Sequence, residues 1–254
     1  MLKVLLVAIL GLLPTLPCRA QTLEILTEED PPYSFIQPDG TVSGAGVEIV
    51  KEIQKRIGNT DPIHVVPWAR AYLNIQKRPN VVVFTMSRTK ARDPLFYWVG
   101  PILENNWVII ARKDSKIHIK SLEDAMTLKS IGVVRGYAWT EYMEQKDFKN
   151  LHIATSHSSN ARMLNSGRVQ AMLSTDLTYR SVLRAENLNP DEFEVILNVK
   201  NVKMYVALSK KTSEAIVKKW QAGFQAMKDD GTFRKILQTW VPASNMPEYE
   251  EPAD

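Results

Sequence analysis

The chain has 254 residues, with 32 Lys or Arg and 28 Asp or Glu, and 44% of its residues are hydrophobic. So balanced a charge argues against a surface that binds nucleic acids or membranes electrostatically, and we expect no nucleic-acid partner. The length allows one large domain or two lobes of about 115 residues each.

Residues 1–20 have the pattern of a secretory signal peptide. Lys3 precedes the apolar run VLLVAILGLL, which is shorter than the roughly 20 residues that span a membrane, and we expect cleavage after Ala20. The alternative is a buried or interfacial N-terminal helix. Cys18 could begin a lipoprotein, but Pro17 stands before it where a small residue is expected.

After cleavage at Ala20 no cysteine would remain, which excludes disulfides, a thiolate nucleophile and a cysteine-based metal site. Without Lys3 and Arg19, 30 basic and 28 acidic residues leave a net charge of about +2. An exported chain without disulfides is compatible with the bacterial periplasm, where we expect the protein.

The first part of the chain predicts alternating strands and helices. The clearest helix is 46–58, in which apolar residues recur at helical spacing and Gly58 suits the end. Strands are expected at 22–29, 63–68 and 80–86, with a loop at 30–41 and a second helix at 69–78. This β-α-β-α-β order predicts a parallel sheet.

The second part repeats this alternation and completes the prediction of an α/β fold. Strands are expected at 107–113, 150–156, 169–175, 193–198 and 202–211, and helices at 121–128, 159–168, 176–187, 213–231 and 232–241. Residues 130–143 should form a strand, a glycine turn and a helix. Residues 242–254 are polar, with three prolines, and are expected to be a disordered tail.

Polar residues follow several of these strands at their carboxyl ends. They are Glu29 and Asp30, Thr85 to Ser87, Arg135 to Tyr137, and Thr175 with Asp176. In open α/β sheets ligands bind beyond the carboxyl ends of the strands. The pattern therefore predicts a ligand site at this edge.

Five motifs in order give the chain a resemblance to a known family. They are PPYSF with DGTVSGAGVEIVKEIQKRIG, FTMSRTKARDPLFYWVGPI, SIGVVRGYAWTEY, SGRVQAMLSTD and MKDDGTFRKILQTWV. Over residues 22–241 the chain resembles the family 3 extracellular solute-binding proteins, the polar amino-acid receptors of ABC transporters. Their type II periplasmic binding fold has two lobes, each a mainly parallel sheet flanked by helices, joined by two crossing strands.

The resemblance implies one lobe at 22–108 plus 204–241 and a second at 109–203, which close around a ligand. It further implies a monomer that captures a small polar solute, an amino acid or a related carboxylate. An ABC permease or a membrane sensor would receive that solute. We expect no cofactor, no bound metal and no enzymatic activity.

The resemblance places the ligand's carboxylate at Arg92, whose planar fork can donate two parallel hydrogen bonds. Thr85, Met86 and Ser87 would add donors and acceptors, and the backbone of Tyr137–Thr140 begins a helix that favours an anion. The alternative for Arg92 is a surface arginine near a turn. Tyr33, Trp68, Tyr137 and Trp139 could stack on the ligand, although Trp68 could equally be a packing residue.

The partner of a ligand ammonium is less clear from the sequence. Thr175 stands where the family commonly has an aspartate, and Asp176 follows it, so that Asp176 would face the opposite side of a regular strand. Asp30 and Glu29 are further candidates. The alternative for Asp176 is the N-cap of the next helix.

Two other classes of function remain in view. Some relatives of the fold are dehydratases of prephenate-like acids, and Glu29, Asp30 or Asp176 could act as the acid or base that an enzyme needs. A hydrolase or metal protein finds less support, because GxSxG is absent and His152 and His157 are poorly spaced for a metal.

Overall fold

The computed structural model describes residues 22–247, so the predicted signal peptide lies outside the described residues. The strands are β1 (Glu24–Thr27), β2 (Phe35–Ile36), β3 (Val42–Ser43), β4 (Ile63–Val65), β5 (Val81–Ser87), β6 (Phe96–Arg112), β7 (Ile131–Val134), β8 (Leu151–Ala154), β9 (Ala171–Thr175) and β10 (Phe193–Ser209). The helices are α1 (Ala45–Ile57), α2 (Trp68–Lys77), α3 (Leu122–Met126), α4 (Ala138–Gln145), α5 (His157–Asn165), α6 (Thr178–Ala185), α7 (Glu214–Asp229) and α8 (Thr232–Trp240).

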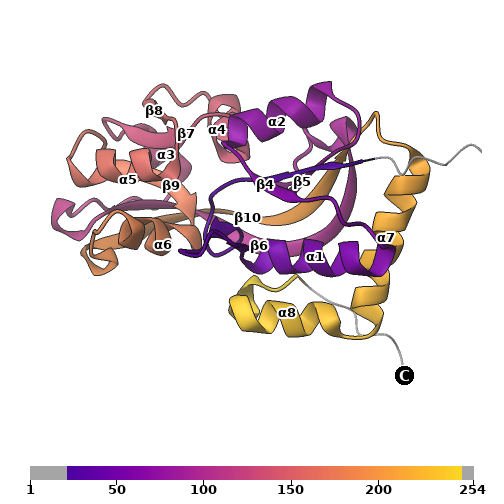
Figure 1. Cartoon of the computed structure of the whole chain (residues 1–254). Helices are drawn as coiled ribbons and strands as arrows, with labels where there is room; N and C mark the ends of the chain where they lie inside the picture. Colours follow the sequence, from indigo (N-terminus) through magenta and orange to yellow (C-terminus); the bar gives the residue numbers. More distant parts are fainter. Residues whose placement is uncertain (1–21, 248–254) are drawn as a thin grey trace, which may run out of the picture.

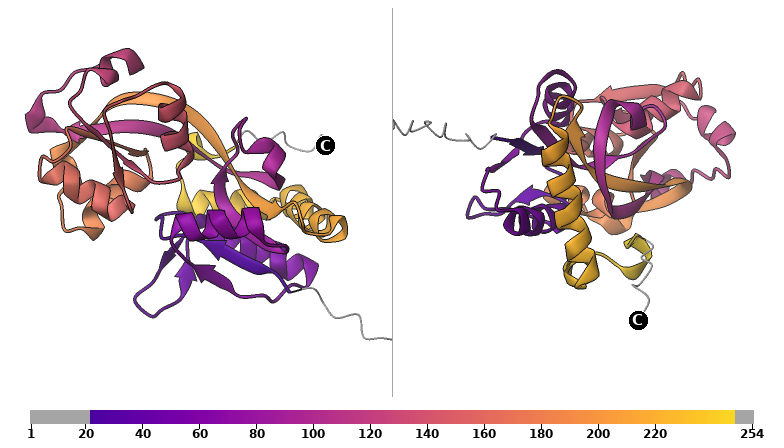
Figure 2. Two further views of the ribbon diagram at one scale, coloured as in Figure 1. Left: turned by 90° about the horizontal axis from the view of Figure 1, so that it is seen from above. Right: turned by 90° about the vertical axis from the view of Figure 1, so that its right-hand side faces the viewer.

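The main sheet has the strand order β4-β1-β5-β10-β6-β9-β7-β8. At one end β1 pairs in parallel with β4 and β5, and at the other end β7 pairs in parallel with β8 and β9. Two antiparallel strands of 17 residues, β6 and β10, join these ends. They run through both lobes in Figures 1 and 2, which confirms the predicted two-lobed α/β fold.

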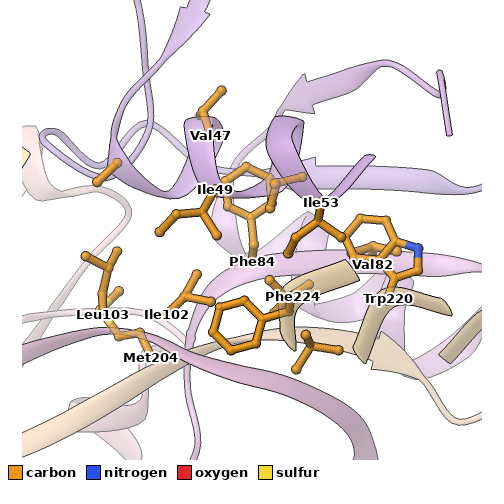
Figure 3. Close-up of a cluster of buried hydrophobic side chains, with 14 of the residues drawn as sticks. Val47, Ile49, Ile53, Val82, Phe84, Ile102, Leu103, Met204, Trp220 and Phe224 are labelled. Atoms are coloured by element: carbon orange, nitrogen blue, oxygen red, sulfur yellow. The ribbon is translucent and has the colours of Figure 1, made fainter. Parts of the chain in front are cut away.

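An apolar core holds the first lobe together (Figure 3). Val47, Val50 and Ile53 of α1 are fully buried, as their helical spacing predicted, and they belong to one cluster with Trp220 and Phe224 of α7. A second cluster lies against α2, α3 and α4, and a third fills the second lobe between α5, α6 and the sheet. Burial on both faces explains why β5 and β7, which lie inside the sheet, are almost wholly apolar.

Several predicted boundaries were wrong. The strands expected at 193–198 and 202–211 are one strand, β10, because its middle stays paired with β6 from Val195↔Ile110 to Met204↔Leu103, through two register shifts. The disordered tail was predicted to start at residue 242, which is too early. Residues 242–247 include a short 3-10 helix, Ala243–Asn245, and Asn245 is buried. Residues 248–254 lie outside the described residues.

The predicted lobe boundaries, at 108/109 and 203/204, fall inside β6 and β10, and their placement stays a prediction. Across residues 22–247 no helix combines the length and the apolar character needed to cross a bilayer.

Candidate functional site

The carboxyl ends of β1, β5, β7 and β9 meet between the lobes, as the strand-end pattern predicted. The residues there enclose a small space of about 20 Å³, which we call the inner cavity. Eight predicted site residues line it: Asp30, Trp68, Thr85, Ser87, Arg92, Tyr137, Trp139 and Thr175. Next to it lies a larger space of about 460 Å³, the outer chamber, lined by Glu28, Glu29, Val65, Val66, Pro67, Trp68, Ala69, Val134, Arg135, Tyr137, Thr155, Ser156 and His157.

Arg92 is the central cation of the inner cavity. Its side chain is 1% exposed, so the surface-arginine alternative was wrong. Nε donates to Glu141 Oε2 at 3.2 Å, and Nη2 donates to Glu141 Oε1 and to the Gly136 carbonyl, both at 2.9 Å. The guanidinium carbon also lies 4.6 Å from the centroid of the Tyr72 ring. Arg92 therefore already holds a carboxylate in a fork geometry, and that carboxylate belongs to the opposite lobe.

Two acidic side chains of the first lobe face the same region. Glu28 accepts a hydrogen bond from the Tyr137 hydroxyl, and Asp30 Oδ1 accepts one from Thr178 Oγ1 at 2.8 Å. Burial raises the pKa of Glu28 well above its usual value, and the charge of Asp30 adds to this rise. Burial also raises the pKa of Asp30 to about 7. Within residues 22–247 neither carboxylate forms an ion pair with a Lys or Arg.

His157 lies beside Asp30, with 3.8 Å between Nε2 and Oδ1, which is too long for a hydrogen bond. Its ring packs edge-on against Tyr137 at 5.0 Å between centroids. Burial lowers the pKa of His157 to about 4, so the imidazole is neutral at pH 7. The site therefore combines two buried acidic groups, which accept hydrogen bonds but form no ion pair with a Lys or Arg among residues 22–247, with one arginine whose ion-pair partner is internal.

The aromatic side chains form one continuous wall across the cleft. Trp68 and Tyr137 come from opposite lobes and lie 5.5 Å apart between ring centroids, and Trp139 stacks on Tyr137 at 4.5 Å. Trp68 Nε1 also donates to the Gly136 carbonyl at 2.7 Å. Trp68 and Tyr137 line both the inner cavity and the outer chamber.

Four predicted site residues do not line the inner cavity. Tyr33 is fully buried, and its hydroxyl accepts from Asn105 Nδ2 at 3.2 Å. Met86 is also fully buried, and Thr140 donates to the Val134 carbonyl at 2.6 Å. The strand pleat turns Met86 away from the cleft and the helix turns Thr140 away, whereas Tyr33 is buried from the turn before β2.

Asp176 is the fourth. Its carboxylate connects β6 with the segment that follows α8. Its carboxylate accepts from Asn106 Nδ2 at 2.8 Å and from Asn245 Nδ2 at 3.1 Å. The N-cap alternative was also wrong, because α6 has no side-chain cap at its N-cap, and Thr175 Oγ1 accepts from the backbone N–H of Thr178 at 3.0 Å instead.

Sequence reasoning missed Glu28 and Glu141. Glu28 belongs to the acidic run that ends β1, so its neighbours Glu29 and Asp30 were a signal for it. Glu141 lies four residues after Tyr137 on α4, and no local pattern connects it with Arg92, 49 residues earlier. In the described part of the chain no group of three or more His, Cys, Asp or Glu is placed to hold a metal ion.

Comparisons with known proteins show which family the chain belongs to. Residues 23–243 match the model of the bacterial extracellular solute-binding proteins, family 3. The chain is 22% identical to the arginine-binding periplasmic protein of Mannheimia haemolytica, covering 95% of this chain and 99% of that protein. It is also 22% identical to the L-cystine-binding protein TcyJ of Escherichia coli, covering 92% of this chain and 87% of that protein.

Solved structures share the fold at low identity. A histidine kinase sensor domain with similarity to periplasmic binding proteins superposes with a TM-score of 0.80 at 19% identity, covering 91% of this chain and 99% of that chain. An ancestral arginine-binding protein bound to arginine gives a TM-score of 0.76 at 24% identity, covering 87% of this chain and 98% of that chain. The match over residues 23–243 shows that the chain belongs to the bacterial extracellular solute-binding proteins of family 3.

Proposed function

We propose that the protein binds a small polar solute of the amino-acid class between its lobes and delivers it to an ABC permease or a membrane sensor. The observation that carries this proposal is the arrangement of charge in the cleft. One buried guanidinium, Arg92, lies in the same cavity wall as the carboxylate of Asp30, with Glu28 beside it. An α-amino acid offers the complementary carboxylate and ammonium.

Thr175 stands where the family commonly has an aspartate, and we propose that Asp30 and Glu28 bind the ligand ammonium in its place. Both have a raised pKa because burial disfavours their charged forms. A ligand ammonium beside them would restore the charged forms and release protons. Thr175 keeps a hydroxyl in the cavity wall but carries no charge.

The relatives support the cellular setting of the proposal. The two relatives described above are named as an arginine-binding and an L-cystine-binding protein, and the first is named as periplasmic. We therefore propose an exported protein of the periplasm, cleaved near Ala20, that works as a monomer. Because the fold is similar to that of a histidine kinase sensor domain, we propose a membrane sensor as well as a permease as the recipient of the solute.

Binding without turnover is part of the proposal. An ancestral precursor of cyclohexadienyl dehydratase shares the fold with a TM-score of 0.71 at 21% identity, so the scaffold is compatible with both roles. The acidic groups at hand, Glu28 and Asp30, are here committed to hydrogen bonds with Tyr137 and Thr178 across the cleft. These contacts hold the lobes together, which a binding protein requires.

A thermal-shift screen of residues 21–254 tests the proposal. The panel contains the twenty amino acids, L-cystine, polyamines, dicarboxylates and prephenate-like acids. A ligand at a hundredfold excess over its dissociation constant adds about 2.7 kcal/mol to the free energy of unfolding, which a melting curve resolves easily. Stabilisation by an amino acid without its consumption supports the proposal. Stabilisation by no member of the panel, or turnover of a prephenate-like acid, contradicts it.

A further inference from the structure

The carboxylate of Glu141 occupies the position that a ligand carboxylate needs. Its two oxygens accept from Nε and Nη2 of Arg92 at 3.2 and 2.9 Å. This two-bond fork is the geometry by which arginine binds a free carboxylate. The third described bond of the guanidinium goes to the Gly136 carbonyl at 2.9 Å. A ligand carboxylate can therefore reach the fork of Arg92 only if Glu141 leaves it.

The space around this pair leads to the same conclusion. The inner cavity measures about 20 Å³, which is room for one water molecule and not for an amino acid. The outer chamber, at about 460 Å³, can take the remainder of a ligand. As long as Glu141 holds Arg92, a ligand in the outer chamber has no access to the guanidinium.

Of the two partners, Glu141 is the one that can move. Its side chain is 29% exposed, against 1% for Arg92. Arg92 is further held by the Gly136 carbonyl and by the rings of Tyr72 and Trp68, at 4.6 and 5.5 Å from the guanidinium carbon. In contrast, within residues 22–247 the hydrogen bonds of the Glu141 side chain go to Arg92 alone. Glu141 can therefore rotate into water, which satisfies its charge, while Arg92 stays in place.

The pair also joins the two lobes. Arg92 follows β5 in the first lobe, and Glu141 lies in the first turn of α4 in the second lobe. The fork therefore connects the two lobes across the cleft, and it adds to the Trp68 bond to Gly136 across the same gap.

We propose that Glu141 is an internal competitor of the ligand, which latches the lobes through Arg92 and must be displaced by the ligand's carboxylate. This inference rests on the proposed function. Only a solute with a free carboxylate can take over the fork, so the latch selects amino acids against their amides and their decarboxylated amines. The latch also lowers the apparent affinity, because part of the binding energy goes to displacing Glu141.

Glu141→Gln tests the latch, since a neutral amide keeps the shape but weakens the fork. Glu144→Gln is the matched control, because Glu144 is an exposed residue of the same helix. Residues 21–254 contain no cysteine, so spin labels can be attached specifically through Lys77→Cys in α2 and Glu123→Cys in α3. Both positions are exposed, and they lie in different lobes.

Without ligand, the label-to-label distances should be short and narrow in the wild-type and Glu144→Gln backgrounds, and longer or broader in Glu141→Gln. Identical distributions in all three backgrounds would overturn the latch. This measurement needs no ligand, so it separates failure of the latch from failure of the proposed function.

Calorimetry with the amino-acid panel is the second arm. Any amino acid that binds the wild type should bind Glu141→Gln about fivefold more tightly or better, and the corresponding carboxamide should bind neither well. Equal or weaker binding to Glu141→Gln would overturn the competition. Binding to Glu141→Gln alone would support it. If neither protein binds any amino acid, the proposed function fails, and the distances alone decide on the latch.

Discussion

Thr178 in the second lobe donates a hydrogen bond of 2.8 Å to the carboxylate of Asp30 in the first lobe. Both side chains are buried, and His157 lies 3.8 Å from the same carboxylate. This contact brings an acid with a raised pKa and an imidazole with a lowered pKa into one cluster. The two pKa shifts change the free energy of unfolding in opposite directions as pH rises, and each shift can be removed by replacing one residue.

In the wild type, Asp30 lowers the free energy of unfolding as pH rises, and Asp30→Asn should remove this contribution. The pKa of Asp30 is about 7 in the folded protein and 3.8 as its ordinary value, so unfolding between these pH values releases a proton. The free energy of unfolding therefore falls as pH rises from about 4 to about 7, by at most about 1.4 kcal/mol per pH unit. Asn keeps an oxygen for Thr178 but does not titrate. Urea unfolding at several pH values should show this contribution missing.

His157→Gln should have the opposite effect. The pKa of His157 is about 4 in the folded protein against 6.5, so unfolding takes up a proton, and stability rises with pH between about 4 and 6.5. In the wild type this rise opposes the fall from Asp30 over the same range. Over this range the free energy of unfolding should therefore rise with pH more steeply in Asp30→Asn than in the wild type. In His157→Gln it should fall with pH more steeply than in the wild type. Parallel curves for both variants would contradict the pKa shifts.

Tyr137→Phe should weaken the contact between the lobes. The Tyr137 hydroxyl donates to Glu28, and this bond opposes the rise of the Glu28 pKa caused by burial. Its loss should lower the free energy of unfolding by about 1 kcal/mol and raise the pKa of Glu28 further. Tyr142→Phe is the control, since within residues 22–247 the Tyr142 hydroxyl has no hydrogen bond and its ring packs near Trp107. Equal unfolding curves for Tyr137→Phe and the wild type would refute this role.

Sequence reasoning found the elements whose causes are local. The spacing of Val47, Val50 and Ile53 fixes the buried face of α1, and the polar residues after the strands meet at one edge of the sheet, where they line the inner cavity. It failed where the cause is distant. Glu104 and Asn105 are polar yet lie buried within β6, where Glu104 Oε1 lies 3.4 Å from Lys203 Nζ and Asn105 Nδ2 donates to the Tyr33 hydroxyl. The bond between Arg92 and Glu141 depends on how the lobes meet, which no local pattern records.

Asp176→Ala separates a structural residue from a binding residue. The Asp176 carboxylate accepts from Asn106 and Asn245 and does not line the inner cavity. We expect the free energy of unfolding to fall by about 1–3 kcal/mol, because these amides lose their acceptor. Ligand affinity measured by calorimetry should change less than twofold. Asn245→Ala should reproduce part of the loss in stability. A loss of affinity without loss of stability would return Asp176 to the site.

Arg92→Ala should lower ligand affinity at least tenfold, which corresponds to about 1.4 kcal/mol, because the carboxylate loses both fork donors. The fold should survive, since Glu141 is 29% exposed and can be hydrated once its partner is gone. Arg88→Ala is the control, because Arg88 is 40% exposed and pairs with Asp93 on the surface. Unchanged affinity of Arg92→Ala by calorimetry, with the circular dichroism spectrum intact, would reject Arg92 as the clamp.

The double variant Arg92→Ala with Glu141→Gln joins this test to the latch. Glu141 is expected to act on the ligand only through the guanidinium that both compete for. Removing its charge should therefore tighten binding when Arg92 is present and change nothing when it is absent, so that the two effects are not additive. If Glu141→Gln tightened binding equally in both backgrounds, Glu141 would act by general repulsion of an anionic ligand, and the fork would not be the point of competition.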